Sequence, residues 1–310
     1  MTRTNAVLAL LLAAAVWGLA FIFQKSATRH IGPLAFIAAR AVVAALALTP
    51  LALAEQRRGS SSSTPRLCGV AVAGGVAFFI AAWLQQAGLE TASVTNTGFL
   101  TSLYVVITPL LAWGWSRQAL SPITWGAVAL SAVGIWLLGG ASFAAFSQGD
   151  VLVSVSAFFW AAHVIVTGRA GSFGRPMAFT ALQFVVVAAL GATGATLFEV
   201  TTLAKVTAAA LDIAYVGLLS SALAFTILTL ALRHVRPAEA AVMVSLETVF
   251  AAAAAYVWLG ERLSPLGWVG AALIVAAALL VQLGAAPHRG EPSCLPRSSG
   301  PRGDVRRRAA

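Results

Sequence analysis

Two charged residues lie inside long apolar stretches of this sequence. Glu247 is the one carboxylate near the middle of such a stretch, and Arg40 lies several residues inside another. A charged group inside an apolar segment usually faces a cavity or a partner. Glu247 is therefore expected either to carry a proton or to form a structural hydrogen bond with a neighbouring helix. Arg40 is expected to attract an anionic group, to pair with a carboxylate, or to extend toward lipid headgroups.

A stripe of polar residues marks a second place where chemistry could occur. Thr97, Thr101, Tyr104 and Thr108 are spaced by four, three and four residues, which places them on one face of a helix. A polar stripe on an apolar helix faces either a water-filled pathway or a neighbouring helix more readily than lipid. We favour the pathway.

Three more helix faces carry aromatic and polar residues together. The faces are, in order, Trp17, Phe21 and Gln24; Trp160, His163 and Thr167; and Trp83, Gln86 and Glu90. Trp17 and Trp160 lie mid-segment, away from the membrane interface where tryptophan normally collects. They either line a cavity or pack closely as structural residues. A single buried histidine either titrates near neutrality or stays neutral and hydrogen-bonded.

The elements that must position these residues are membrane-spanning helices. The chain is 59% hydrophobic and 10% charged, against roughly 25% charged in soluble domains. A span needs about 20 mostly apolar residues, and open backbone in lipid has no water to satisfy it. Ten such helices are predicted, at 5–24, 33–54, 67–88, 93–115, 122–140, 149–168, 176–198, 208–231, 238–259 and 264–284.

The sequence repeats itself with an offset of 143 residues. The matched pairs are Trp17 and Trp160, Pro33 and Pro176, Phe36 and Phe179, Ser121-Pro122 and Ser264-Pro265, and Trp125 and Trp268. Five spans per copy force the second copy to enter the membrane from the opposite side, which is the inverted-repeat plan of secondary transporters. The fold class predicted is an all-α integral membrane protein, with repeats at 1–143 and 144–284. Residues 285–310 are predicted to form a disordered basic cytoplasmic tail.

The basic residues predict the orientation of the chain. Fifteen lysines and arginines fall on the face that carries the N-terminus and four on the other, with Arg40 inside a span. Because basic residues gather on the cytoplasmic side, both termini are expected in the cytoplasm, and the protein is expected in the cell (inner) membrane. The net charge of +10 does not indicate nucleic-acid binding, because the basic residues lie in short gaps between apolar runs and in the tail.

Other classes of function lack their motifs. Cys68 and Cys294 have no metal-ligand spacing, so neither a metal site nor a disulfide framework is expected. No P-loop, dinucleotide-binding motif or His-Glu-x-x-His motif occurs, so we expect no catalytic residues and no cofactor. A carrier is favoured. A facilitative channel or a lipid flippase-like protein remains the alternative, and an intramembrane enzyme is the least favoured.

The run from Tyr256 to Ile274, which contains Gly260-Glu261 and Trp268, resembles the signature of the drug/metabolite transporter superfamily in its EamA-type branch of ten-helix exporters. Further segments resemble the same pattern: Trp17-Gly18, Arg40, Thr108-Pro109-Leu110 and Ser245-Leu246-Glu247. The chain departs from that pattern at Thr248, where the family often has proline, and at Arg117-Gln118, which the offset matches to Gly260-Glu261.

The resemblance implies proton-driven or gradient-driven export of small metabolites such as amino acids or drug-like solutes, or facilitated exchange. The partners expected are a small-molecule substrate and membrane lipid, with the chain a monomer or homodimer. Residues expected to bind substrate or line a cavity are Trp17, Gln24, Arg40, Gln86, Thr101, Tyr104, Trp160 and His163, with Glu247 the candidate for proton coupling.

Overall fold

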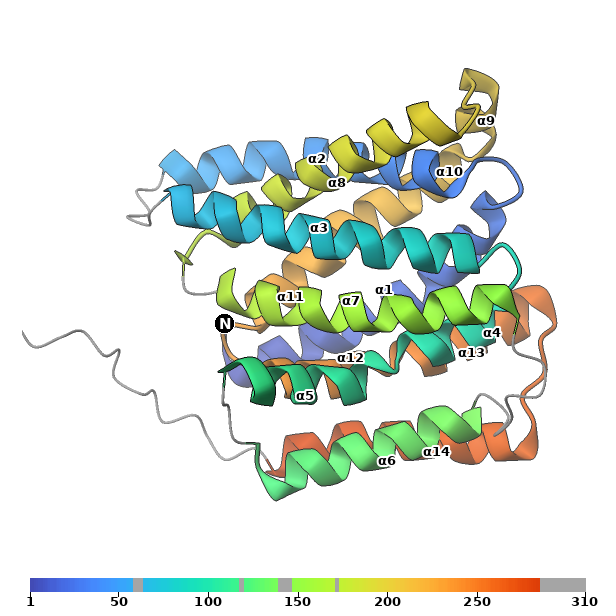
Figure 1. Cartoon of the computed structure of the whole chain (residues 1–310). Coiled ribbons are helices and arrows are strands. Elements are labelled where there is room, and N and C mark those ends of the chain that lie inside the picture. Colours follow the sequence, from blue (N-terminus) through green and yellow to red (C-terminus); the bar gives the residue numbers. More distant parts are fainter. Residues whose placement is uncertain (58–63, 117–119, 139–146, 171–172, 285–310) are drawn as a thin grey trace, which may run out of the picture.

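The computed structural model describes residues 1–57, 64–116, 120–138, 147–170 and 173–284, and the elements assigned in these ranges are all helical (Figure 1). The predicted tail, 285–310, lies outside the described residues. The helices of the first half are α1 (Arg3–Ala27), α2 (Pro33–Arg57), α3 (Thr64–Gly88), α4 (Val94–Thr101), α5 (Tyr104–Ser116) and α6 (Pro122–Leu138). Those of the second half are α7 (Gln148–Ala170), α8 (Pro176–Phe198), α9 (Leu203–Ala208), α10 (Ala210–Ala214), the π-helix η2 (Tyr215–Ala224), α11 (Phe225–Ala231), α12 (Pro237–Val244), α13 (Glu247–Leu259) and α14 (Pro265–Gly284).

Proline begins five of these helices. Pro33, Pro122, Pro176, Pro237 and Pro265 are the first residues of α2, α6, α8, α12 and α14. A proline at the first helical position loses no hydrogen bond, because the N–H groups of the first turn have no partner within the helix. The helices therefore begin at the Pro-containing breaks between apolar runs, where the sequence predicted the spans to begin.

Eight helical segments in the described residues are long and apolar enough to cross a membrane. They coincide with the first four predicted spans and with the sixth to ninth. The predicted fifth and tenth spans fall on two shorter apolar helices, Pro122–Leu138 and Pro265–Val281.

Three of the predicted spans are not single regular helices. The fourth span breaks at Ser102-Leu103, between α4 and α5, and the ninth breaks at Ser245-Leu246, between α12 and α13. At both breaks the backbone N–H groups bond to carbonyls three residues back, as Val105 does to Ser102 and Thr248 does to Ser245. Such bonds tighten the helix locally. The eighth span contains the π-helix η2 instead of a continuous α-helix.

The helices form a bundle with a closely packed pair at each edge (Figure 1). Helices α2 and α8 pack along one edge, and α6 and α14 pack along the other. Gly134 and Gly270 allow the second pair to approach closely, because a Cβ atom on Gly134 would lie only 2.7 Å from the Gly270 carbonyl oxygen. The broken helices, α1, α3, α7 and η2 lie between these two pairs.

The two ends of the bundle carry different turns. We refer to the end with the N-terminus as the near end; there Arg3 forms an ion pair with Glu239 at 3.3 Å. At the opposite, far end, the Lys25 ammonium group donates hydrogen bonds to the carbonyl oxygens of Leu89 and Ala92. Glu261 also lies at the far end and accepts hydrogen bonds from the backbone N–H and the hydroxyl group of Thr95.

Candidate functional site

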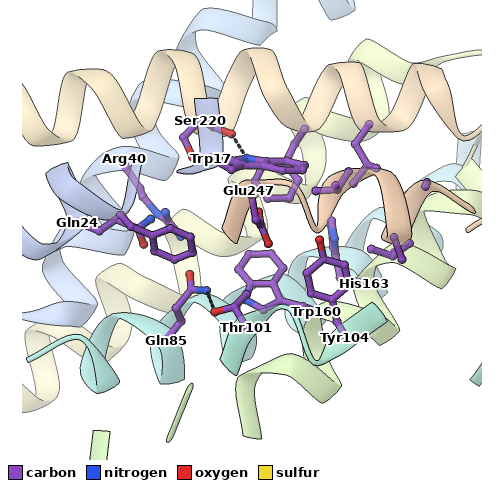
Figure 2. A pocket seen from close by; sticks show the side chains of 17 residues that line it. Trp17, Gln24, Arg40, Gln85, Thr101, Tyr104, Trp160, His163, Ser220 and Glu247 are labelled. Carbon is purple, nitrogen blue, oxygen red and sulfur yellow. Dashed lines mark hydrogen bonds between the residues drawn. The ribbon is translucent and has the colours of Figure 1, made fainter. Parts of the chain in front are cut away.

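A cavity lies inside the bundle, between α1, the broken helices and η2–α11 (Figure 2). It offers about 60 Å³ to the centres of water molecules, room for only a few waters. The predicted residues that line it are Trp17, Gln24, Arg40, Thr101, Tyr104, Trp160, His163 and Glu247. Its other lining residues are Phe21, Gln85, Val164, Ser220, Phe225, Leu228, Ala240, Ala241 and Val244.

Trp17 is held in place by the π-helix and by a close approach of α1 to α13. Its indole N–H donates a hydrogen bond of 2.9 Å to the carbonyl oxygen of Ser220, in η2 (Figure 2). The next residue, Gly18, faces α13, and a Cβ atom there would lie 2.4 Å from Phe250 Cβ and 2.7 Å from the Glu247 carbonyl oxygen. The Trp17-Gly18 pair thus combines a cavity-lining side chain with the contact that brings α13 beside it.

Tyr104 and Glu247 occupy equivalent places, because each is the first residue after a helix break. Tyr104 begins α5 and Glu247 begins α13. Glu247 points into the cavity, and Tyr104 lies near its carboxyl group (Figure 2). The two breaks are joined directly by a hydrogen bond between the hydroxyl groups of Ser102 and Thr248. Thr248 also donates a 3.3 Å hydrogen bond to the Gly98 carbonyl oxygen.

Arg40 is buried among aromatic rings and does not extend to the surface. Its side chain is only 3% exposed, and the guanidinium carbon lies 5.5 Å from the centre of the Phe78 ring and 5.9 Å from that of Phe36. Among the described residues, no carboxylate lies within ion-pair distance of Arg40, and its Nε has no hydrogen-bond partner. Cation–π contacts stabilise a guanidinium group, but they do not neutralise its charge.

His163 is part of a buried hydrogen-bonded group on α7 and α8. Its Nε2 lies 3.0 Å from Gln183 Oε1 and 3.3 Å from the Thr167 hydroxyl group. Because the amide oxygen can only accept, Nε2 carries the proton in this bond, and Nδ1 has no protein partner. His163 is thus held by hydrogen bonds to Gln183 and Thr167.

Gln86 does not line the cavity. Its side-chain N–H donates a 2.9 Å hydrogen bond to the Gln24 carbonyl oxygen. The adjacent residue, Gln85, lines the cavity instead and donates a 2.7 Å hydrogen bond to the Thr101 hydroxyl group. Ser220 and Phe225 also line the cavity, although nothing in the apolar run around them indicates this in the sequence.

The cavity wall combines aromatic faces with polar atoms that have no protein partner. Phe225 lies 4.6 Å from Trp17 and 5.8 Å from Trp160, measured between ring centres. The unpartnered buried atoms include Trp160 Nε1, Arg40 Nε and Gln24 Oε1. Such a site can bind a small polar molecule that also has an apolar part. In the described residues, no cluster of three or more His, Cys, Asp or Glu side chains could hold a metal ion.

Comparison with known proteins agrees with the fold. A solved structure titled "Crystal structure of protein" superposes with a TM-score of 0.73 at 20% identity, and the match covers 91% of this chain and 98% of that one. An "Uncharacterized transporter" from Archaeoglobus fulgidus is 28% identical over 281 residues, which is 91% of this chain and 87% of the relative. A "Probable terminal-alkyne amino-acid exporter" from Streptantibioticus cattleyicolor is 28% identical over 298 residues, covering 91% and 94% of the two chains.

A family model matches the chain twice. The model of the EamA-like transporter family matches residues 4–140 and again residues 147–283. The chain therefore holds two copies of the family's unit in a multi-pass membrane protein. These matches indicate a transporter and not an enzyme, and the chain belongs to the EamA-like transporter family.

Proposed function

We propose that this transporter is a secondary active exporter of small zwitterionic metabolites, amino acids above all, and that it works by alternating access. One observation carries the proposal: Arg40 and Glu247 line the same aromatic-walled cavity from different helices, and Arg40 has no acidic partner among the described residues. Arginine suits a carboxylate. Glu247 and the faces of Trp17 and Trp160 suit an ammonium group. The relative named as an amino-acid exporter supports this choice of substrate.

The proposed architecture is ten spans in two inverted repeats, 1–143 and 144–284, followed by a cytoplasmic tail at 285–310. The family matches begin at residues 4 and 147, which supports the offset of 143 residues. The packing supports it as well, because α3 packs against α7 while η2, in the matching span, packs against α1. The near end would face the cytoplasm. The chain would act in the cell membrane as a monomer or homodimer.

The proposed coupling group is Glu247. A coupled carrier needs a group that binds a proton on one side and releases it on the other, and Glu247 is the carboxylate that lines the cavity. Its place at the start of α13, next to a helix break, would let it change its surroundings when the two halves of the span move. Discontinuous helices of this kind form the sites of many secondary transporters.

Counterflow in proteoliposomes tests the substrate class. Vesicles loaded with unlabelled phenylalanine should accumulate labelled phenylalanine, and external phenylalanine should compete. Phenethylamine, which lacks the carboxylate, and 3-phenylpropionate, which lacks the ammonium group, should compete at least tenfold less well, since each leaves one charged residue without its partner. Single-channel currents, or equal competition by all three compounds, would contradict the proposal.

Substitutions at Arg40 test how the carboxylate is held. Arg40→Ala should abolish counterflow. Arg40→Lys should retain part of it if charge alone matters, and none if bidentate geometry matters. Arg57→Ala is the matched control, because Arg57 ends the same helix in an exposed position. Normal counterflow by Arg40→Ala would remove Arg40 from the site.

Cysteine labelling tests the orientation. Cysteines introduced at Ser62 and Ser172 should react only from the cytoplasm and one at Ser142 only from outside; all three positions lie outside the described residues. Labelling of Ser62→Cys and Ser142→Cys from the same side would reject the five-span repeat.

A further inference from the structure

A second, larger pocket lies at the near end of the bundle, beside the turn 232–236 that joins α11 to α12. It offers about 290 Å³ to the centres of water molecules. We refer to it as the near-end pocket. Its lining residues are Ala112, Ile165, Gly168, Arg169, Leu232, Arg233, His234, Val235, Arg236 and Pro237.

The near-end pocket is rich in positive charge. Arg169, Arg233 and Arg236 line it, and the lining residues that the structure describes include no aspartate or glutamate. Glu239 accepts a 2.7 Å hydrogen bond from Arg236 Nε and also pairs with Arg3. Arg233 is exposed and has no ion-pair partner among the described residues.

Positively charged groups also surround His234. Burial, the N-terminal amino group and Arg233 all lower the pKa of His234 below its usual value. The charged form of the ring is thus disfavoured in part by neighbouring positive charges. An anion in the pocket would relieve the repulsion among these groups.

The near-end pocket lies on the same helices as the central cavity. On α7, Ile165 lines the pocket and the adjacent Val164 lines the cavity. On α11, Leu228 lines the cavity and Leu232, at its C-cap, lines the pocket one turn further on. A solute leaving the pocket would therefore need to move only about one helical turn, roughly 5 Å, to reach the cavity wall.

The equivalent place at the far end is filled. With the 143-residue offset, the turn 89–93 corresponds to 232–236, and Lys25 corresponds to Gly168. The Lys25 ammonium group bonds the carbonyl oxygens of Leu89 at 2.6 Å and Ala92 at 2.9 Å. Gly168 has no side chain to do the same, and Arg233 stands where the far end has Glu90. At the near end Gly168 leaves this space open, and arginine side chains line it.

We propose that the near-end pocket is a second binding site, separate from the central cavity, which takes the carboxylate group of the substrate before it enters that cavity. The role in transport rests on the proposed function, whereas anion binding in the pocket does not. A lipid phosphate has similar chemistry and is distinguished by the test below.

The first test uses a cysteine inside the pocket. Gly168→Cys is introduced after Cys68 and Cys294 have been replaced by serine; an added Cβ atom would lie 3.2 Å from Pro237 Cγ, so a small shift accommodates it. A negatively charged methanethiosulfonate should react on the order of tenfold faster than its positively charged counterpart, because of the net positive charge nearby. A neutral reagent measures access to the thiol independently of charge.

Arg233→Gln, added to Gly168→Cys, should reduce the preference for the negative reagent several-fold. Arg57→Gln, at the end of α2 and outside the pocket, should leave it unchanged. Equal rates for the two charged reagents, or a preference that survives in Arg233→Gln, would overturn the anion site.

The second test identifies the anion. In vesicles of phosphatidylcholine alone, phenylalanine and 3-phenylpropionate should slow the reaction of the negative reagent with the thiol of Gly168→Cys. Phenethylamine should not slow it. This protection should persist in Arg40→Ala, since Arg40 does not line the near-end pocket. Protection that instead requires phosphatidylglycerol in the vesicle, with no effect of either carboxylate, would overturn the substrate site in favour of a lipid site. Protection by carboxylates without any counterflow would keep the binding site and reject the proposed function.

Discussion

Helices α2 and α8 hold each other by two contacts of the same kind, whereas the residues around the cavity differ between the two halves. The Glu199 carboxylate accepts hydrogen bonds from the backbone N–H groups of Leu34 and Ala35, at the start of α2. The Glu55 carboxylate accepts them from Met177 and Ala178, at the start of α8. The offset of 143 residues matches Leu34 to Met177 and Ala35 to Ala178.

Around the cavity, residues matched by the offset differ in their contacts or in their chemistry. Trp17 and Trp160 match by the same offset and line the same cavity, but the Trp17 N–H bonds the Ser220 carbonyl oxygen while the Trp160 N–H has no partner. Tyr104 matches Glu247, so the first copy has a phenol group at the position where the second copy has a carboxyl group. At the ends of the bundle, Lys25 matches Gly168.

This difference indicates where the two copies were free to diverge. A carboxylate at a helix N-terminus satisfies backbone groups that lipid cannot, so both copies need it. A cavity for an asymmetric solute needs different groups on its two sides, so matched positions there gain nothing by staying alike.

The largest effect expected is from Glu247→Gln. This change keeps the size of the side chain and most of its hydrogen bonding, but the amide group cannot bind and release a proton. Accumulation driven by a pH gradient should be abolished in proteoliposomes, while folding and substrate exchange are largely kept. Glu90→Gln, at an exposed far-end position, is the control. If the Gln variant keeps the wild-type pH dependence, Glu247 is not the coupling group and His163 becomes the candidate.

Trp17→Phe and Trp160→Phe should separate the two matched tryptophans. Trp17→Phe removes the hydrogen bond to η2 and should lower the free energy of unfolding by about 1 kcal/mol. Trp160→Phe removes an N–H without a protein partner, so stability should stay nearly unchanged and the apparent substrate affinity should fall several-fold. Thermal unfolding and counterflow measure the two effects. Equal losses of stability would show that the two indoles have the same role.

Much of the fold could be predicted because its signals are local. Long apolar runs ending at prolines predict helices that start at Pro33 or Pro176, and polar residues inside apolar runs predict a common interior surface. The π-helix Tyr215–Ala224 could not be predicted, because its composition matches that of a regular span. Nor could the breaks at Ser102 and Ser245, where neither glycine nor proline marks the change.

The residues that line the cavity were predictable to within about one helical position. Eight of the nine residues predicted for it line the cavity, and the ninth, Gln86, is adjacent to Gln85, which does. Consecutive residues on a helix point about 100° apart, and with two glutamines in a row nothing in the sequence shows which one faces inward. The roles of these residues in transport stay predictions.

The paired carboxylates should have equal and moderate effects. Glu55→Gln and Glu199→Gln each keep a neutral acceptor but lose the charge that favours a helix N-terminus. Each should lower the free energy of unfolding by about 0.5–1 kcal/mol, close to the value for helix-cap changes. Thermal unfolding in detergent measures both. A loss at one position only would show that the two contacts are not equivalent.

A small effect on stability, and the sharpest test of the contrast between the two ends, is expected from Lys25→Met. Methionine keeps much of the apolar stem but cannot donate to the carbonyl oxygens of Leu89 and Ala92. A cation at a helix C-terminus contributes about 0.3–1 kcal/mol, so the loss of stability should stay within that range. If Lys25 holds the far end closed, a cysteine at Gln24, in the cavity, should react faster from the far side in Lys25→Met than in the parent. Its rate from the near side should not change, because Gly168 provides no matching contact there. An unchanged rate from the far side would mean that the Lys25 bonds only cap α3, and that the two ends differ in chemistry without differing in how readily they open.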